Sequence, residues 1–149
     1  MEIKQKVIAH LINLIESQLE SVSTDLAALQ DAKENDTKSS MGDKYETSAE
    51  MLSAEQDKLT AQQVKLQQFL VQLSNFQSSK PTKAIKLGSL VQTNRGFFLI
   101  GIPFGQFKID EQIVMAISAA SPVGQLMLNK IQGEKFEFRG VGYEVVEVW

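Results

Sequence analysis

Residues 52–76, LSAEQDKLTAQQVKLQQFLVQLSNF, contain no Gly or Pro, and their larger side chains return to one helical face every three or four residues. Steps that alternate between three and four are typical of the a and d positions of a coiled coil. The seam formed in this way is polar towards its start and apolar towards its end. We therefore predict a long α-helix that packs against a second helix. The seam positions are Leu52, Glu55, Leu59, Gln62, Leu66, Phe69, Leu73 and Phe76.

A matching helix is predicted upstream, in residues 3–30, which also lack Gly and Pro. Only a short polar stretch, residues 35–42, separates the two runs, so we expect an antiparallel helical hairpin over residues 1–78. At about 1.5 Å per residue, the roughly 28 residues between positions 49 and 76 carry the hairpin end on the order of 40 Å from its base. The apolar face of the first helix comprises Ile8, Leu11, Ile12, Ile15, Leu19, Val22, Leu26 and Leu29.

The composition changes after residue 78, because the rest of the chain holds eight of the nine glycines, all three prolines and the only tryptophan. Residues 79–83 are a short polar linker, and residues 84–149 contain β-branched and aromatic runs separated by turn residues. We predict strands over 84–93, 96–102, 107–109, 113–118, 135–139 and 143–148. Ser121 followed by Pro122 is typical of a helix start, and this helix is expected to reach about Asn129. The fold class is therefore α+β, with a strongly bent antiparallel sheet and one short helix after the hairpin.

Charge and composition exclude several classes of function. The net charge of −3 disfavours binding to free duplex nucleic acid, which usually requires a dense face of Lys and Arg. The absence of cysteine excludes disulfides and thiolate chemistry. No apolar run is long enough for a secretion signal or a membrane span, so we expect a cytoplasmic protein without a membrane partner.

Acidic residues are concentrated where the hairpin turns, at about residues 35–50. Gly42 provides backbone freedom, and Asp43 is placed to cap the second helix with Glu46 three residues later, as in a capping box. This interpretation gives the two acids a purely structural role. Between positions 31 and 50 the acids are Asp31, Glu34, Asp36, Asp43, Glu46 and Glu50, against Lys33, Lys38 and Lys44.

The same segment, GDKYETSAE at 42–50, resembles the hairpin-tip motif of the bacterial Gre transcript cleavage factors, which runs Gly-Asp, two variable residues, then Glu-Asn-Ala-Glu-Tyr. Gly42, Asp43 and Glu46 match, whereas Thr and Ser replace the Asn and Ala, and Glu50 comes one position late. Residues 117–126, ISAASPVGQL, resemble the carboxy-terminal signature of the same family, in which a strand is followed by Ser-Pro and a short helix. Gly133 and residues 143–148 resemble that domain's closing glycine and last strand.

The resemblance implies a protein that binds RNA polymerase through an FKBP-like carboxy-terminal domain, with Ser121 and Pro122 in the docking region. It also implies that the hairpin enters the secondary channel, where Asp43 and Glu46 help to hold Mg²⁺ and position water for cleavage of backtracked RNA. Glu50 is a further candidate for this role. The factor would then be no enzyme alone, would need no cofactor in its free form, and would share Mg²⁺ with the polymerase.

Two other functions remain open from the residues. A Gre-like regulator can occupy the same channel without promoting cleavage, and the loose match after Glu46 is compatible with that role. A coiled-coil adaptor unrelated to transcription would explain the hairpin, with its acids simply solvated. The lone His10 has no partner residue in the sequence that indicates a ligand site.

Overall fold

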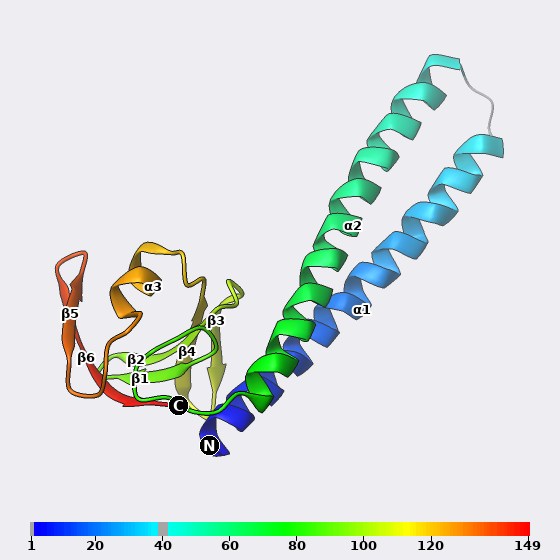
Figure 1. Cartoon of the computed structure of the whole chain (residues 1–149). Helices are drawn as coiled ribbons and strands as arrows, with labels where there is room; N and C mark the ends of the chain where they lie inside the picture. Colours follow the sequence, from blue (N-terminus) through cyan, green and yellow to red (C-terminus); the bar gives the residue numbers. More distant parts are fainter. Residues whose placement is uncertain (1, 39–41) are drawn as a thin grey trace. The chain divides into compact units, whose positions relative to one another are not determined.

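The chain has two long helices followed by a six-stranded sheet and a short helix, which confirms the predicted α+β class (Figure 1). The computed structural model describes residues 2–38 and 42–149, with the side chains of 36–38 and 42–48 outside the description. Contacts divide the chain into a hairpin unit, Ile12–Val71, and a sheet unit, Met1–Leu11 with Gln72–Trp149. The start of the first long helix and the end of the second therefore belong to the sheet unit. The sequence-based division, in contrast, places residues 1–78 together.

Helices α1 (Glu2–Lys38) and α2 (Gly42–Ser78) form the antiparallel hairpin that the heptad spacing predicts (Figure 1). In the hairpin unit the side chains between the helices are buried, and burial of each large apolar side chain contributes roughly 1.5–3 kcal/mol. The hairpin is stabilised mainly by this packing, because long helices gain little from intrinsic propensity alone. The buried residues are Ile15 and Val22 of α1 and Leu59, Leu66 and Phe69 of α2.

Two of the predicted seam positions are wrong. Glu55 and Gln62 are exposed, and the half-buried residues are instead Gln56 and Gln63. Both sets alternate steps of three and four around the same leucines, so the sequence pattern alone does not discriminate between them. Lys33 donates a hydrogen bond from Nζ to Oε1 of Gln56, which joins the two helices through polar side chains.

The predicted turn is also too long. Helix α1 continues to Lys38 and α2 begins at Gly42, so residues 35–38 are helical rather than part of the turn. These four residues include no Gly or Pro, and polar side chains do not by themselves end a helix. The polar composition of residues 35–38 therefore did not predict where α1 ends.

The sheet has the strand order β3-β4-β2-β1-β6-β5. Its short connections are close hairpins: β1 pairs with β2, β3 with β4, and β5 with β6, all antiparallel. Helix α3 (Pro122–Met127) lies between β4 and β5 in the chain. The strands are β1 (Leu90–Thr93), β2 (Gly96–Ile100), β3 (Gly105–Ile109), β4 (Gln112–Ile117), β5 (Lys135–Phe138) and β6 (Val141–Val148).

The sheet is mixed, which corrects the prediction of an antiparallel sheet. Strands β2 and β4 are parallel, with Phe97 opposite Val114 and Ile100 opposite Ile117. After β2 the chain crosses to the edge strand β3 and returns through β4, which inserts beside β2. Local patterns report strands and turns but not this long-range pairing.

The segment 84–89, predicted as the start of a strand, is irregular. The backbone of Ile85 pairs with the segment after α3, since its N–H donates to the carbonyl of Lys130 and its carbonyl accepts from the N–H of Asn129. Ile85 is fully buried. The apolar character that suggested a strand is thus explained by a core position outside the sheet.

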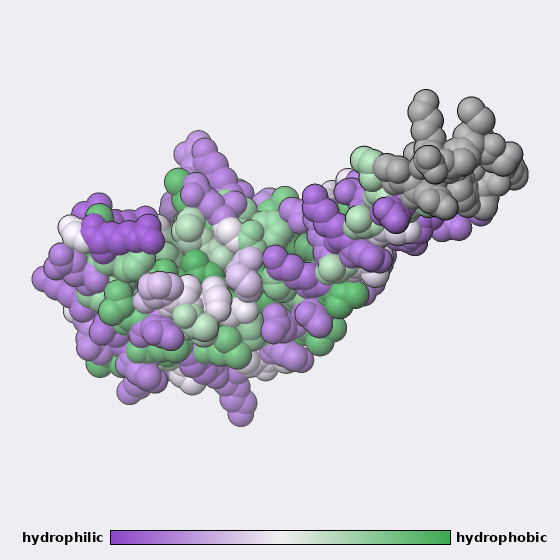
Figure 2. Space-filling model, turned by 90° about the horizontal axis from the view of Figure 1, so that it is seen from above, coloured by the Kyte–Doolittle hydropathy of each residue, from purple (hydrophilic) through white to green (hydrophobic). Residues whose placement is uncertain are grey.

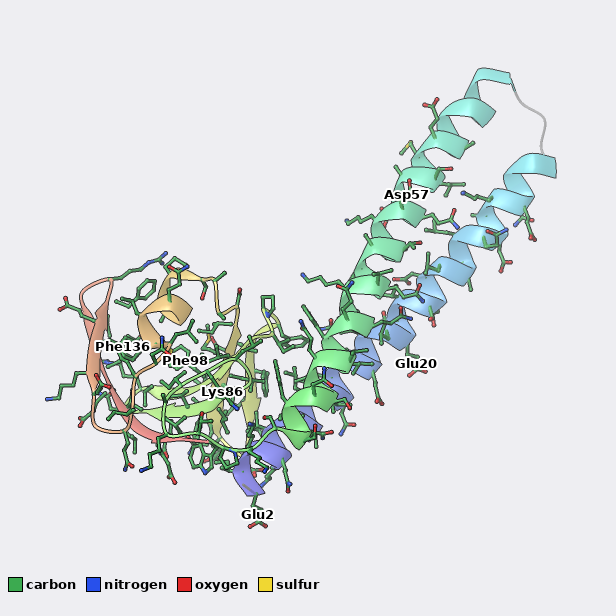
Figure 3. The ribbon with its side chains drawn as sticks, viewed as in Figure 1. Glu2, Glu20, Asp57, Lys86, Phe98 and Phe136 are labelled. Carbon is green, nitrogen blue, oxygen red and sulfur yellow. The ribbon has the colours of Figure 1, made fainter. Side chains whose placement is uncertain are left out.

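Each face of the sheet is covered within the sheet unit. On one face, Phe98 and Ile100 pack in a core cluster with Met127 of α3 and Phe136 of β5. Phe98 and Phe136 are labelled in Figure 3. The other face meets the helix ends: the ring of His10 stacks on Phe107 with centroids 5.9 Å apart. The structure thus encloses apolar side chains on both sides of one sheet.

We predict that Leu66→Ala destabilises the protein by roughly 2–4 kcal/mol, because Leu66 is 4% exposed in the hairpin seam. Val71→Ala is the control, since Val71 in the same unit is 64% exposed, and its effect should stay within about 0.5 kcal/mol. Chemical denaturation of the full chain measures both. Equal small changes would show that Leu66 is not a core residue.

Candidate functional site

The turn before α3 is built around the hydroxyl of Ser121. This Oγ accepts a hydrogen bond from the N–H of Gly124 at 3.1 Å and donates one to the carbonyl of Ser118 at 2.7 Å. Ser121 has extended backbone angles, φ −65° and ψ 156°, and Pro122 follows at the helix start. The predicted N-cap is therefore confirmed. Ser121 therefore has a structural role, and Pro122, the first residue of the helix, is exposed.

Gly124 leaves no space for a side chain in this turn. A Cβ at this position would stand 2.3 Å from the carbonyl oxygen of Ser118 and 2.9 Å from Oγ of Ser121. The carbonyl belongs to the backbone and cannot move aside easily. Leu126, two residues later on the same helix, is exposed.

The two acids of the tip motif are the second and fifth residues of α2, because that helix begins at Gly42. Asp43 is thus the second residue of the helix, and its predicted capping contact with Glu46 three residues later lies outside the described side chains. Carboxylates in a first turn are still stabilised by the helix dipole, so a structural role remains available. The side chains of Asp43 and Glu46 lie outside the described residues. Glu50, one turn after Glu46, is exposed.

The two units differ strongly in charge. The hairpin unit has eleven Asp and Glu residues and five Lys, a formal charge of −6. The sheet unit has ten Lys and Arg and seven Asp and Glu, a formal charge of +3. Every hairpin acid with a described side chain is exposed, including Glu20 and Asp57, which project away from the helices in Figure 3. The hairpin surface seen in Figure 2 is accordingly mostly hydrophilic.

At the end of α2 in the sheet unit, the charge of Lys86 acts on Lys4, and Lys80 and Lys83 stand in the adjoining linker; we call Lys4, Lys80, Lys83 and Lys86 the lysine cluster. Lys4 is only 5% exposed, and its Nζ donates to Oγ of Ser79 at 3.4 Å. Lys86 donates to the carbonyl oxygen of Lys80 at 3.2 Å. Burial lowers the pKa of Lys4 below its usual value, and the positive charge of Lys86 lowers it further. None of the four forms an ion pair with a carboxylate among the described residues.

An open cavity of about 600 Å³ lies in the sheet unit beside the first turns of α1. Lys6 and Asp110, which form an exposed ion pair, stand at this cavity. Sequence reasoning missed it, because its walls come from residues far apart in the chain. The apolar lining comprises Ile3, Val7, Phe97, Ile109 and Val114.

Within residues 2–35 and 49–149, no three His, Asp or Glu side chains gather closely enough to hold a metal ion. The predicted Mg²⁺ ligands, Asp43 and Glu46, fall outside this range. In the described part of the chain no helix combines the length and the apolar character needed to cross a bilayer.

The structure therefore presents an acidic helical hairpin and a basic α+β sheet unit with a tightly capped turn. Comparison with protein-family models and with curated proteins finds no match to this chain. Its function is consequently argued from its own residues.

We predict that Gly124→Ala destabilises the protein by roughly 1–3 kcal/mol, because the new methyl group meets the carbonyl of Ser118. Gly142→Ala is the matched control, since nothing lies within 4 Å of a Cβ there. Thermal unfolding of both variants tests the prediction. If the two substitutions had equal effects, the close approach at Gly124 would have no energetic importance.

Proposed function

We propose that this chain is a Gre-type transcription elongation factor, which binds RNA polymerase in the bacterial cytoplasm and promotes cleavage of backtracked RNA. The observation that carries the proposal is the position of the Gly42-Asp43 and Glu46 motif. It occupies the first five residues of the second helix, next to the turn of an antiparallel hairpin. The Ser121-Pro122 signature then occurs in the sheet unit, at the start of a short helix that follows a strand.

The chemistry of the two acids fits this role. Asp43 and Glu46 are three residues apart in one helix, so they share a helical face. Carboxylate oxygens are the ligands that Mg²⁺ prefers, and bound Mg²⁺ activates water for attack on a phosphodiester. The chain would contribute the two carboxylates to an active site that the polymerase otherwise provides. It is thus an accessory factor rather than an enzyme.

The sheet unit is the proposed docking domain. Its mixed sheet carries α3 on one face, with Met127 in the core, an arrangement that we assign to the FKBP-like type. Pro122 is exposed on α3 beside the rigid turn at Gly124, as a docking residue must be. Ser121 would contribute indirectly by holding this turn.

A related function, channel occupancy without cleavage, is favoured by one feature of the sequence. After Glu46 the chain has Thr47 and Ser48 where the Gre motif has Asn and Ala, and its next acid, Glu50, comes one position late. Docking would be the same in both cases. Only a cleavage measurement separates the two functions.

We predict that Asp43→Asn and Glu46→Gln each abolish most of the stimulation of RNA cleavage in backtracked elongation complexes with Mg²⁺. The amides keep the size of the side chains but remove the charge that binds the metal. Release of short 3′ RNA fragments is the measurement, with Glu20→Gln as a control that removes an exposed acid elsewhere on the hairpin.

Competition with the unmodified chain for polymerase should be unchanged in the amide variants, because docking does not depend on the tip. Normal cleavage by both amide variants would show that the two acids only stabilise the start of the helix. An unmodified chain that binds polymerase without raising the cleavage rate would reject cleavage and support channel occupancy.

We also predict that Pro122→Ala weakens binding to core polymerase by roughly tenfold, which corresponds to about 1.4 kcal/mol, while leaving the unfolding temperature nearly unchanged. Pro122 is exposed, so its ring is accessible to a partner. Pro103→Ala is the control, since Pro103 is also exposed in the sheet unit. If both variants bound as tightly as the unmodified chain, Pro122 would be excluded from the interface.

A further inference from the structure

We propose that the open cavity beside the start of α1 binds a small molecule that carries an ammonium group on an apolar body. The apolar body lies against Val7, Phe97 and Val114, and the ammonium group meets the carboxylates of Glu2 and Asp110. The proposal concerns the sheet unit alone and does not rest on the proposed function.

The cavity has the size of a ligand site and is formed within one unit. Its volume of about 600 Å³ falls within the roughly 300–1,000 Å³ that is usual for ligand pockets. All of its lining residues belong to Met1–Leu11 or Gln72–Trp149, so the sheet unit forms it without the hairpin unit. Protein interiors are otherwise closely packed, and a space of this size between a helix and strands is an exception to that packing.

The buried part of the lining is apolar. Val7, Phe97 and Val114 are buried, and they come from α1, β2 and β4, with Phe97 opposite Val114 in the parallel strand pair. Ile3 and Ile109 are half-buried at the same cavity. An apolar ligand removes such surface from water, which favours binding in proportion to the area that it covers. The body of the ligand is therefore expected to be apolar.

The charged groups at the cavity favour a cation over an anion. Glu2 and Asp110 contribute two carboxylates, whereas Lys6 contributes the only ammonium group among the nine lining residues. Lys6 is already paired with Oδ2 of Asp110. Oδ1 of Asp110 and the carboxylate of Glu2 have no hydrogen bond or ion pair among the described residues. An anionic ligand must compete with Asp110 for Lys6, whereas a cationic ligand meets acceptor oxygens that the fold leaves unused.

A purely structural role explains only part of this arrangement. Glu2, labelled in Figure 3, lies in the first turn of α1, where the helix dipole stabilises a carboxylate. The Lys6–Asp110 pair joins the helix to the sheet, although exposed ion pairs contribute little to stability. Neither role accounts for an apolar cavity at which carboxylate oxygens remain without a partner in the described chain. A ligand with an apolar body and an ammonium group accounts for both features.

The backbone turn that carries Asp110 is well defined. Ile109 pairs with Gln112, so Asp110 and Glu111 form a two-residue turn between β3 and β4. Both have positive φ, 47° and 68°, as the type I′ turn of a β-hairpin requires. Asp tolerates this conformation, whereas Glu adopts it rarely. The backbone of Asp110 is thus held in place at a conformational cost, and a site that is already ordered loses less entropy when it binds a ligand.

Three probes with the same two-ring body test the ligand class: biphenylmethylamine, biphenylmethanol and biphenylacetate, which are cationic, neutral and anionic near neutral pH. Titration calorimetry on the full chain at low ionic strength measures their affinities. The amine should bind roughly threefold to tenfold more tightly than the alcohol, and the acetate should bind most weakly. Added salt should reduce the advantage of the amine.

The place of binding is tested by fluorescence and by variants. Trp149, the only tryptophan, stacks on Phe97 with centroids 6.3 Å apart, so its emission should change when a probe lies against Phe97. Glu2→Gln should lower the affinity for the amine roughly threefold and leave the affinity for the alcohol unchanged, because only a charge is removed. Ile3→Ala should weaken the binding of both probes, since it removes part of the apolar lining.

The matched control is Glu137→Gln, which removes an exposed acid from the same unit outside the cavity and should bind all three probes as the unmodified chain does. Saturating amine should also raise the unfolding temperature, because a ligand that binds only the folded chain stabilises it. Failure of all three probes to bind would overturn the site. Equal affinities for the three probes, tightest binding of the acetate, or equal effects of Glu2→Gln and Glu137→Gln would overturn the assignment of a cationic ligand to this cavity.

Discussion

The sheet unit depends on the position of one ring, that of Phe76 in the last turns of α2. A Cβ on Gly88 would stand 2.7 Å from Cδ1 of this ring, and one on Gly101 would stand 2.9 Å from its Cζ. The ring therefore rests on the backbone just before β1 and just after β2. Burial of such a ring contributes roughly 1.5–3 kcal/mol and at the same time fixes the end of α2 against the β1–β2 hairpin. The contact joins the end of α2 to the start of the sheet.

The hairpin is not equally stable along its length. Leu59, Leu66 and Phe69 are buried, whereas nearer the turn the helices meet through the Lys33–Gln56 hydrogen bond. A hydrogen bond contributes only about 0.5–1.5 kcal/mol net, less than a buried Leu or Phe. Local opening is therefore easiest at the acidic end. The apolar packing of the described hairpin residues is thus concentrated away from the turn.

Sequence patterns predicted the features that depend on neighbouring residues. The Ser121 cap was predictable because it needs only a hydroxyl, Pro122 and a glycine within four positions. The predicted coiled-coil frame was wrong at Glu55 and Gln62, because the common leucines satisfy two frames equally well. The parallel pairing of β2 with β4 depends on contacts between distant segments, which no local pattern reports. For the candidate site, the sequence indicated the acids and Ser121-Pro122. The lysine cluster could not be predicted, because Lys4 lies far in the sequence from the linker lysines.

The net charge of −3 is the sum of two formal charges of opposite sign, −6 on the hairpin unit and +3 on the sheet unit. Charges separated by more than a Debye length of about 10 Å at 0.1 M salt act almost independently. Each unit is therefore expected to attract the opposite charge by itself, an anionic surface for the sheet unit and a cationic surface or metal ion for the hairpin unit. A protein partner that carries separate surfaces of both signs can meet each unit through its own contact, and recognition then depends on two contacts rather than one.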